Sequence, residues 1–495
     1  MRTREDWATL ARSIQPRRQA FIDGAFVDAA SGAEFDTRNP ATGAVLATVA
    51  RGGNEDIDCA VSAARRAFEA GSWSTAAPTH RKAVLLRLAE MIRANADELA
   101  LLDSLDGGKL ITDTSTVDVP GSAAIMQWYA EAIDKQYGEV APTASGDLAI
   151  ITREPLGVIG AVIPWNYPLE MAIWKAAPAL AAGNSVVLKP AEESPLSALR
   201  LAELASEAGL PDGVLNVVPG FGDEAGQALG RHGDVDAIVF TGSTTVGKHF
   251  LRYAGESNMK QVWLEAGGKS ANLVFSGAGD LDLVADKVIF GIFGGAGQVC
   301  SANSRLLVEE RIADELTARV AERAAAIRVG DPLDPDSTMG PLISDKQLSR
   351  VLGYVESGRD ESRLAFGGHR VHTETGGYFL EPTGFTEVPQ TAVISREEVF
   401  GPLLAISTFR TEEEAIAGAN STEYGLAASV FTDNIHQAQR VARALRAGTV
   451  SVNTIDALDV TVPFGGVKQS GFGRDLSLHA LDKYTSLKTT WFAEH

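Results

Sequence analysis

Cysteine is scarce in this sequence: only Cys59 and Cys300 occur among 495 residues. Two cysteines cannot build the disulfide framework of a small secreted protein, so we expect a reducing compartment and a cytoplasmic protein. Cys59 lies within a helical pattern of apolar residues and is predicted to be part of the core.

Positive charge is in deficit, and long apolar runs are missing. The chain carries 44 Lys and Arg against 64 Asp and Glu, a formal net charge of −20. This balance argues against nucleic acid or an anionic membrane as a partner. The most apolar region, residues 172–188, is interrupted by Lys175, Pro178 and Gly183 and does not predict a membrane span. The N-terminal residues lack the apolar run of a signal peptide.

Histidine spacing excludes the common metal sites. The eight histidines show no HExxH motif and no paired-ligand spacing, so no metal site is predicted.

Strands and helices alternate along most of the chain. This alternation predicts a doubly wound α/β sheet between residues 156 and 275, and a second α/β unit after Cys300. At about 150 residues per domain, the length predicts two to four domains. The apolar runs expected to form buried strands are residues 158–163, 185–188, 214–218, 237–240, 271–275, 305–308, 403–409, 427–431 and 450–453.

Residues 137–152 are typical of a β-hairpin with a turn at Ser145-Gly146-Asp147. An isolated hairpin is unstable, so we expect it to pack on another subunit. The segment 488–492 also has a strand pattern and is a natural partner for the hairpin.

A glycine-rich run, residues 290–301, ends on Cys300. A lone cysteine is more often a small buried apolar residue than a nucleophile. Here Gly294, Gly295 and Gly297 free the backbone to bend and let a ligand approach, which favours a presented thiol. Because a free thiol has a pKa of ~8.5, a catalytic site must favour the thiolate through a helix dipole or a neighbouring charge.

Three segments that follow predicted strands carry groups suited to a dinucleotide. The turn 241–247 opens a helix whose N–H groups attract phosphate, although it is not the GxGxxG fingerprint. Residues 220–226 form a second flexible loop. At a third strand end, Lys189 can donate to ribose hydroxyls and Glu192 can accept from the 2′-hydroxyl, as an acid does in NAD sites. Glu192 would repel a 2′-phosphate, so NAD is favoured over NADP.

Two more residues complete a candidate reaction centre. Asn166 lies between Pro164 and Pro168, which stiffen its loop, and a fixed amide N–H suits a developing oxyanion. Glu265 stands beside two glycines just before a strand, and alone it would be interpreted as a solvated loop acid. Together with Cys300, they supply a nucleophile, an oxyanion donor and a base.

These motifs resemble those of the aldehyde dehydrogenase superfamily over essentially the whole chain. The matching segments, in the family's order and spacing, are residues 164–168, 189–192, 240–243, 265–269, 297–300, 397–402 and 463–466. The resemblance implies an α/β, aldehyde dehydrogenase-like fold with a Rossmann-type NAD-binding domain, an α/β catalytic domain and a β oligomerisation arm. The implied ranges are 1–136 and 156–266 for the NAD-binding domain, 267–480 for the catalytic domain, and 137–155 and 481–495 for the arm. A homo-oligomer, dimer or tetramer, is expected.

The resemblance also implies the role of each site residue. Cys300 is the expected nucleophile, Glu265 the base and Asn166 the oxyanion donor in oxidation of an aldehyde through a thiohemiacetal and a thioester. The expected cofactor is NAD, with NADP possible. Its implied contacts are Ile163, Pro164, Trp165, Lys189, Ala191, Glu192, Gly222, Gly226, Phe240, Thr241, Gly242, Ser243, Val246, Glu398 and Phe400.

Segments 128–135, 263–272 and 473–481 more narrowly resemble the 4-(γ-glutamylamino)butanal dehydrogenases of bacterial putrescine catabolism. Many relatives carry a bulky aromatic residue and an asparagine in place of Gly294 and Gly295, so a wider channel is expected beside the thiol.

The same resemblance implies a set of substrate-side residues. Tyr167 and Trp174 match an aromatic pocket of betaine and amino-aldehyde relatives, and aromatic faces attract cations, although Trp174 fits a core position equally well. Asp456 and Asp459 fall on the family's substrate-mouth loop, where a carboxylate suits an amine; a solvated loop is the alternative. The implied residues are Tyr167, Trp174, Ser301, Asp459 and Phe464.

The expected substrate is therefore 4-(γ-glutamylamino)butanal or a related ω-amino aldehyde. A broad-specificity or betaine-type aldehyde dehydrogenase is the first alternative. A CoA-acylating relative is disfavoured because that group generally lacks the base glutamate. A catalytically silent relative is disfavoured because the nucleophile, the base and the oxyanion donor are all present.

Overall fold

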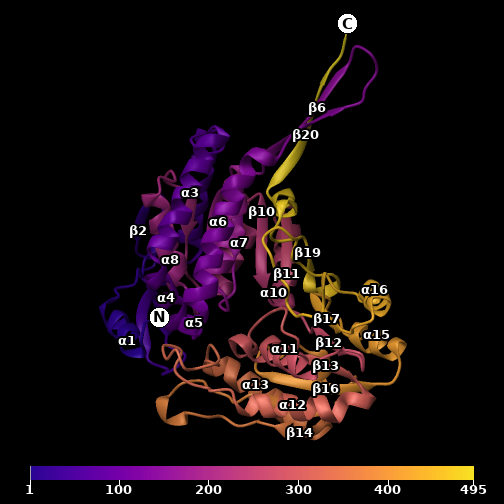
Figure 1. The fold of residues 1–495 in the computed structure, drawn as a ribbon. Helices are drawn as coiled ribbons and strands as arrows, with labels where there is room; N and C mark the ends of the chain where they lie inside the picture. Colours follow the sequence, from indigo (N-terminus) through magenta and orange to yellow (C-terminus); the bar gives the residue numbers. More distant parts are fainter. Residues whose placement is uncertain (1, 495) are drawn as a thin grey trace.

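Two largely parallel β-sheets organise the chain, and a thin β-arm projects from the body (Figure 1). The computed structural model describes residues 2–494. Outside the two sheets and their helices, the elements include α1 (Arg4–Ser13), the β3 (Glu34–Arg38) and β4 (Val45–Ala50) hairpin, α4 (Ala96–Gly107), α5 (Ile111–Asp113), the π-helical turn η1 (Thr114–Asp118) and α14 (Val393–Arg396).

The first sheet has eight strands in the order β19-β11-β10-β7-β8-β9-β1-β2. The five strands from β11 to β9 pair in parallel, with antiparallel strands on either side. The bounds are β1 (Ala20–Ile22), β2 (Ala25–Val27), β7 (Val158–Val162), β8 (Ser185–Lys189), β9 (Leu215–Val217), β10 (Ala237–Gly242), β11 (Gln261–Ala266) and β19 (Gly471–Phe472). Every residue of β7 and β8 is buried, as their continuous apolar runs predict.

Helices cover both faces of this sheet and bury its side chains in two apolar clusters. One face packs against α3 (Pro78–Ala94), α6 (Val119–Ala132), α7 (Pro168–Ala182) and α8 (Leu196–Glu207). The other face packs against α2 (Asn54–Ala70), α9 (Gln227–Arg231) and α10 (Thr244–Gly255). The doubly wound arrangement predicted from the alternating pattern is therefore confirmed.

The second sheet has seven strands in the order β14-β15-β16-β13-β12-β17-β18, all parallel except β14. Its bounds are β12 (Ala271–Val274), β13 (Arg305–Glu309), β14 (Arg363–Phe366), β15 (Thr383–Thr386), β16 (Leu403–Phe409), β17 (Ala427–Phe431) and β18 (Thr449–Val452). Helices α11 (Leu281–Phe293), α12 (Ala313–Ala325) and α13 (Asp345–Glu361) pack on one face, and α15 (Glu412–Asn420) and α16 (Ile435–Ala444) on the other.

Two expectations about these units are corrected. The strand expected at residues 271–275 does not extend the first sheet, because β12 lies in the middle of the second sheet between β13 and β17. Cys59 is exposed rather than part of the core, because it lies on a solvent-facing position of α2.

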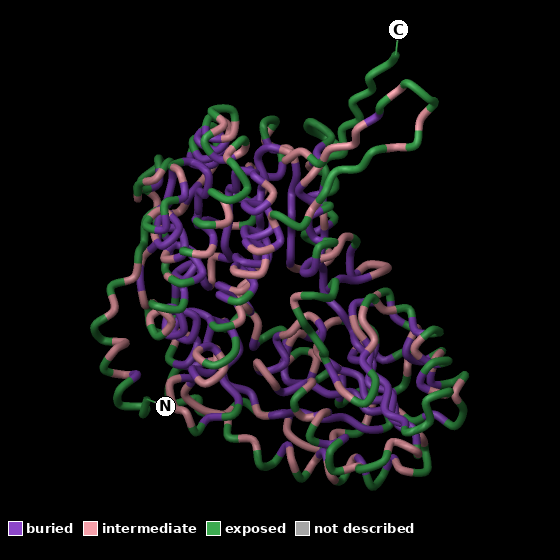
Figure 2. The backbone as a smooth tube through the Cα atoms, turned by 45° about the horizontal axis from the view of Figure 1, so that its top comes forward, coloured by how far each residue is buried: buried purple, intermediate pink, exposed green. Residues whose placement is uncertain are grey.

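The arm consists of β5 (Glu139–Ala141), β6 (Leu148–Pro155) and β20 (Thr485–Phe492). Strand β20 pairs antiparallel with all eight residues of β6, which confirms the predicted partnership between the hairpin and the C-terminal strand. The arm is mostly exposed (Figure 2), and Tyr137, Trp491 and Phe492 at or near it are each more than half exposed. Within residues 2–494, no helix is both long enough and apolar enough to cross a membrane.

Candidate active site

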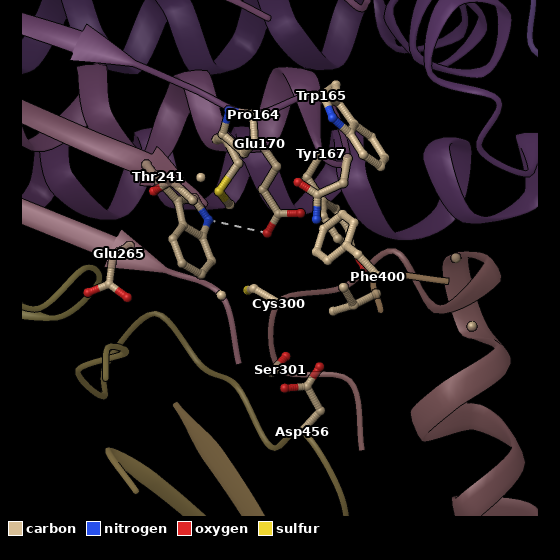
Figure 3. Close-up of a pocket in the computed structure, with 18 of the residues that line it drawn as sticks. Pro164, Trp165, Tyr167, Glu170, Thr241, Glu265, Cys300, Ser301, Phe400 and Asp456 are labelled. Atoms are coloured by element: carbon tan, nitrogen blue, oxygen red, sulfur yellow. Dashed lines mark hydrogen bonds between the residues drawn. The ribbon is translucent and has the colours of Figure 1, made fainter. Parts of the chain in front are cut away.

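A cavity of about 430 Å³ is lined by residues from both sheet units (Figure 3). Cys300, Glu265 and Asn166 all line it, although they are far apart in sequence. The convergence of a thiol, a carboxylate and an amide expected from the sequence is therefore present.

The parallel strands of the first sheet explain this convergence. Their carboxyl ends share one edge, where open α/β sheets bind ligands. The pairing brings Lys189 of β8 beside Val162 of β7, and Thr241 of β10 beside Glu265 of β11. Asn166 follows β7 in the turn that leads to α7.

The loop before Cys300 turns sharply after α11. Gly295, Ala296 and Gly297 all have positive φ, at 56°, 54° and 69°. A Cβ at Gly297 would lie 2.2 Å from the carbonyl oxygen of Gly401, so only glycine fits there. The turn leaves Cys300 partly buried in the cavity wall. A Cβ at Gly294 would meet no atom within 4 Å, so the space beside it is open.

The surroundings of Cys300 disfavour its thiolate form. Burial raises its pKa above the ordinary value, and the negative charges of Asp456, Glu265 and Glu398 raise it further. The expectation that neighbouring groups favour the thiolate is therefore not met by the chain alone. A positive charge arriving with a ligand would act in the opposite direction.

The amide of Asn166 is buried and fixed. Its Nδ2 donates to the carbonyl oxygen of Gln298 at 2.8 Å. Gln298 is itself held, because its Oε1 accepts from the backbone N–H of Ile343 at 2.9 Å. An amide nitrogen has two N–H groups, so the second one is available to the cavity.

Glu265 is 5% exposed, and neither of its carboxylate oxygens has a hydrogen-bond partner among the described residues. The burial rules out a solvated loop acid, and Glu265 lies within β11 rather than in a loop before β12. Burial raises its pKa well above the ordinary value, and the charge of Asp475 contributes, while Lys175 and Lys483 act in the opposite direction.

Asp475 is part of a buried charge cluster behind this carboxylate. It accepts hydrogen bonds from both Lys175 Nζ and Lys483 Nζ. Burial opposes ionisation of Asp475, but the two ammonium groups hold its pKa below the usual range.

The residues proposed to hold the adenosine and phosphate groups fit a dinucleotide. Lys189 Nζ donates to Glu192 Oε2 at 3.0 Å, so the two groups lie together at the end of β8. Ser243 caps α10 by accepting from the backbone N–H of Val246 at 3.3 Å. A Cβ at Gly222 would meet no atom within 4 Å, which leaves the backbone there open to a ligand.

The nicotinamide side also fits. Trp165 and Phe400 make an edge-to-face pair with centroids 5.2 Å apart, and both line the cavity. Glu398 accepts from the backbone N–H of Gly268 at 3.1 Å, and burial raises its pKa to about 7. Thr241 Oγ1 is buried, and it has no hydrogen-bond partner within the described chain, as expected of a group that awaits a ligand.

The predicted substrate-side residues separate into two groups. Tyr167, Trp174, Ser301 and Phe464 line the cavity. Trp174 is both buried and cavity-lining, and it packs edge-to-face against Phe464 with centroids 5.6 Å apart. Asp459 does not reach the cavity: it is exposed, and its carboxylate accepts from the backbone N–H and hydroxyl of Thr461 at 2.8 and 2.6 Å.

The Asp456 carboxylate, from the same loop, does line the cavity. The lining also contains charged residues that the sequence motifs do not assign to the site: Lys109, Asp113, Asp118, Glu170, Arg350 and Asp475. The available signal was a charged residue in a predominantly apolar stretch, because Glu170 and Lys175 are the only charged residues of α7.

Comparisons with known proteins agree with this geometry. The sequence matches the family described as the aldehyde dehydrogenase family over residues 26–490. It is 53% identical over 487 residues to the NADP/NAD-dependent aldehyde dehydrogenase PuuC of Escherichia coli K12, covering 98% of each chain.

Two solved structures are similar over the full length of both chains. One is γ-glutamyl-γ-aminobutyraldehyde dehydrogenase from Burkholderia cenocepacia, with a TM-score of 0.98 and 54% identity. The other is a mutant of the P. syringae indole-3-acetaldehyde dehydrogenase AldA in complex with NAD+ and IAA, with a TM-score of 0.99 and 52% identity. The fold, the cavity and the matched sequence together show that this chain belongs to the aldehyde dehydrogenase family.

Proposed function

We propose that this protein oxidises an amino aldehyde, 4-(γ-glutamylamino)butanal or a related ω-amino aldehyde, to the carboxylic acid with NAD+. The observation that carries the reaction type is the meeting of Cys300, Asn166 and Glu265 in one cavity with the nicotinamide-side residues. The substrate class is supported by the aromatic and carboxylate walls of that cavity and by the amino-aldehyde relative from B. cenocepacia.

The first half of the reaction makes a carbon–sulfur bond. The Cys300 thiol releases its proton to solvent water, and the resulting thiolate sulfur attacks the aldehyde carbon. The carbonyl electron pair moves to oxygen, and the resulting oxyanion accepts from Asn166 Nδ2 and the backbone N–H of Cys300. NAD+, when bound, supplies the acceptor for the hydride that leaves this carbon. The carbon remains on Cys300 as a thioester.

The second half consumes water. Glu265 removes a proton from a water molecule, whose oxygen attacks the thioester carbon. The carbon–sulfur bond breaks, and the acid leaves while the thiolate of Cys300 is restored. A CoA-acylating reaction needs no such base, so the presence of Glu265 in the cavity supports hydrolysis.

The substrate class is tested by the kcat/KM values of the purified enzyme on matched aldehydes. We expect the kcat/KM values of amino and γ-glutamylamino aldehydes to exceed those of aliphatic aldehydes of the same chain length. A preference for long aliphatic aldehydes without nitrogen would contradict the proposed substrate. A preference for an indolic aldehyde would instead place the enzyme with the AldA-like relatives.

The cofactor preference has its own test in Glu192→Ser. The carboxylate of Glu192 would repel a 2′-phosphate, while Lys189 beside it would attract one. We expect the NADP/NAD ratio of kcat/KM to rise about tenfold, the scale of one like-charge contact near a protein surface. The exposed Glu55→Gln on α2 is the charge-matched control. An unchanged ratio would show that Glu192 does not select the cofactor.

We also propose a cytoplasmic homo-oligomer assembled through the arm. The support is the exposed apolar surface near and on the arm, where Leu487, Trp491 and Phe492 face outward. The division into NAD-binding domain, catalytic domain and arm at the boundaries given above remains part of this proposal.

A further inference from the structure

Glu170 is a cavity carboxylate that has no role in the proposed chemistry. Glu170 lies in the first turn of α7 and points into the cavity toward Cys300 (Figure 3). Its Oε1 accepts from Trp174 Nε1 at 3.2 Å, one helical turn further along. Among the ion pairs of residues 2–494, none involves Glu170. Lys109 acts on this carboxylate only through its charge, without a direct contact.

Two of the other charged groups that line the cavity are paired with each other, whereas Asp113 on α5 lines it without an ion pair among residues 2–494. Lys109 Nζ lies 3.2 Å from Asp118 Oδ2, and both side chains are at most 9% exposed. The same ammonium lies 3.4 Å from the centre of the Tyr167 ring. The protein's own cation therefore occupies this face of Tyr167, which cannot also receive a substrate cation.

Asp456 lies on the other side of Cys300 (Figure 3). Asp456 is exposed, whereas Glu170 is only partly exposed. Asp456 also acts on Cys300 as the largest of the carboxylate charges that raise the thiol pKa. A substrate cation beside Asp456 would lower the pKa of the thiol, so Asp456 is the competing site that the test below separates from Glu170.

We infer that Glu170 is the specificity-determining residue that accepts the cationic nitrogen of the substrate, with Trp174 as the residue that positions its carboxylate. The inference rests on the proposed function and narrows it to aldehydes with a free primary ammonium group. Because Glu170 faces Cys300 across one cavity, the ammonium and the aldehyde carbon must both fit between them. ω-Amino aldehydes carry both groups on one chain.

The electrostatics of the site agree with this geometry. Burial raises the pKa of Glu170 to about 8, and the charges of Asp118 on η1 and Asp103 on α4 raise it, while Lys109 and the Trp174 N–H lower it. A bound ammonium stabilises the ionised carboxylate. Selectivity for cationic substrates is therefore expected to increase as pH rises toward and past about 8.

The test compares Glu170→Gln with the unmodified enzyme on 3-aminopropanal and butanal, which have the same length and differ by one ammonium group. We expect the 3-aminopropanal/butanal ratio of kcat/KM to fall about 10- to 100-fold, the range of a lost charge-assisted hydrogen bond. The melting temperature should stay close to that of the parent. The pH dependence of the ratio should disappear in the variant.

Two further variants keep the result interpretable. Glu170→Asp retains the charge and should preserve most of the ratio, which separates charge from packing. If Glu170→Gln leaves the ratio unchanged, or if only Asp456→Asn lowers it, the inference is overturned while the proposed function stands. If the unmodified enzyme shows no preference for any amino aldehyde, the proposed substrate class fails and the inference falls with it.

Discussion

Cys300→Ala is expected to abolish NAD reduction. The variant keeps the cavity and the cofactor residues but has no atom that can bond to the aldehyde carbon. Loss of a covalent nucleophile lowers kcat by roughly 10⁴-fold or more. The measurement is the steady-state rate of NADH formation with a saturating aldehyde. Intact-protein mass after acid quench should show an acyl adduct in the parent and none in the variant.

Cys59→Ala is the matched control, because it removes the only other thiol of the chain. Cys59 is exposed on α2, away from the cavity, so its loss should leave both the rate and the adduct unchanged. A Cys300→Ala enzyme that still formed NADH within tenfold of the parent rate would overturn the assignment of the nucleophile.

Much of the fold follows from local pattern. The strand predicted at residues 403–409 coincides with β16, and the C-terminal strand pairs with the hairpin as expected. Continuous apolar runs bounded by turn residues identify buried parallel strands because both faces of such strands are covered. Part of the site follows from the same logic, since Asn166, Lys189 and Thr241 follow predicted strands whose carboxyl ends share one edge.

The membership of β12 in the second sheet could not be read from the sequence, because pairing partners depend on contacts between distant segments. Glu265 was expected in a loop because its glycine neighbours suggest one, yet β11 continues through Ala266. The exposure of Cys59 depends on which face of α2 meets the sheet. A single small residue changes the apolar periodicity of the helix too little to reveal that face.

The charged residues of the cavity show a second limit of prediction from the sequence. Glu170 lies in α7 and Lys109 in the loop between α4 and α5. Nothing in their local sequence indicates that they share one cavity. Asp459 and Asp456 lie three residues apart on one loop, yet only Asp456 enters the cavity. The conformation of the loop decides which carboxylate enters the cavity. Local hydrogen bonds, such as those between Thr461 and Asp459, set this conformation.

Glu265→Gln is expected to separate the two halves of the reaction. The amide is nearly the same size as the carboxylate but cannot take a proton from water, so the thioester should form and then persist. Rapid mixing should show a burst of NADH that matches the number of active sites, followed by a steady state slower by roughly 10²- to 10⁴-fold. In the parent, the deacylation rate should rise with pH, because burial raises the pKa of Glu265 and keeps it protonated until the solution becomes more alkaline.

The pH profile distinguishes a base from a residue that only shapes the cavity. A structural role would lower the burst and the steady state together and leave the parent's pH dependence in the variant. The proposed role predicts a full burst and a flat deacylation profile, because glutamine does not titrate. Glu55→Gln on α2 should change neither. Loss of the burst in Glu265→Gln would show that this carboxylate is needed when the thiol attacks the aldehyde, rather than only in hydrolysis. Its charge already raises the pKa of Cys300.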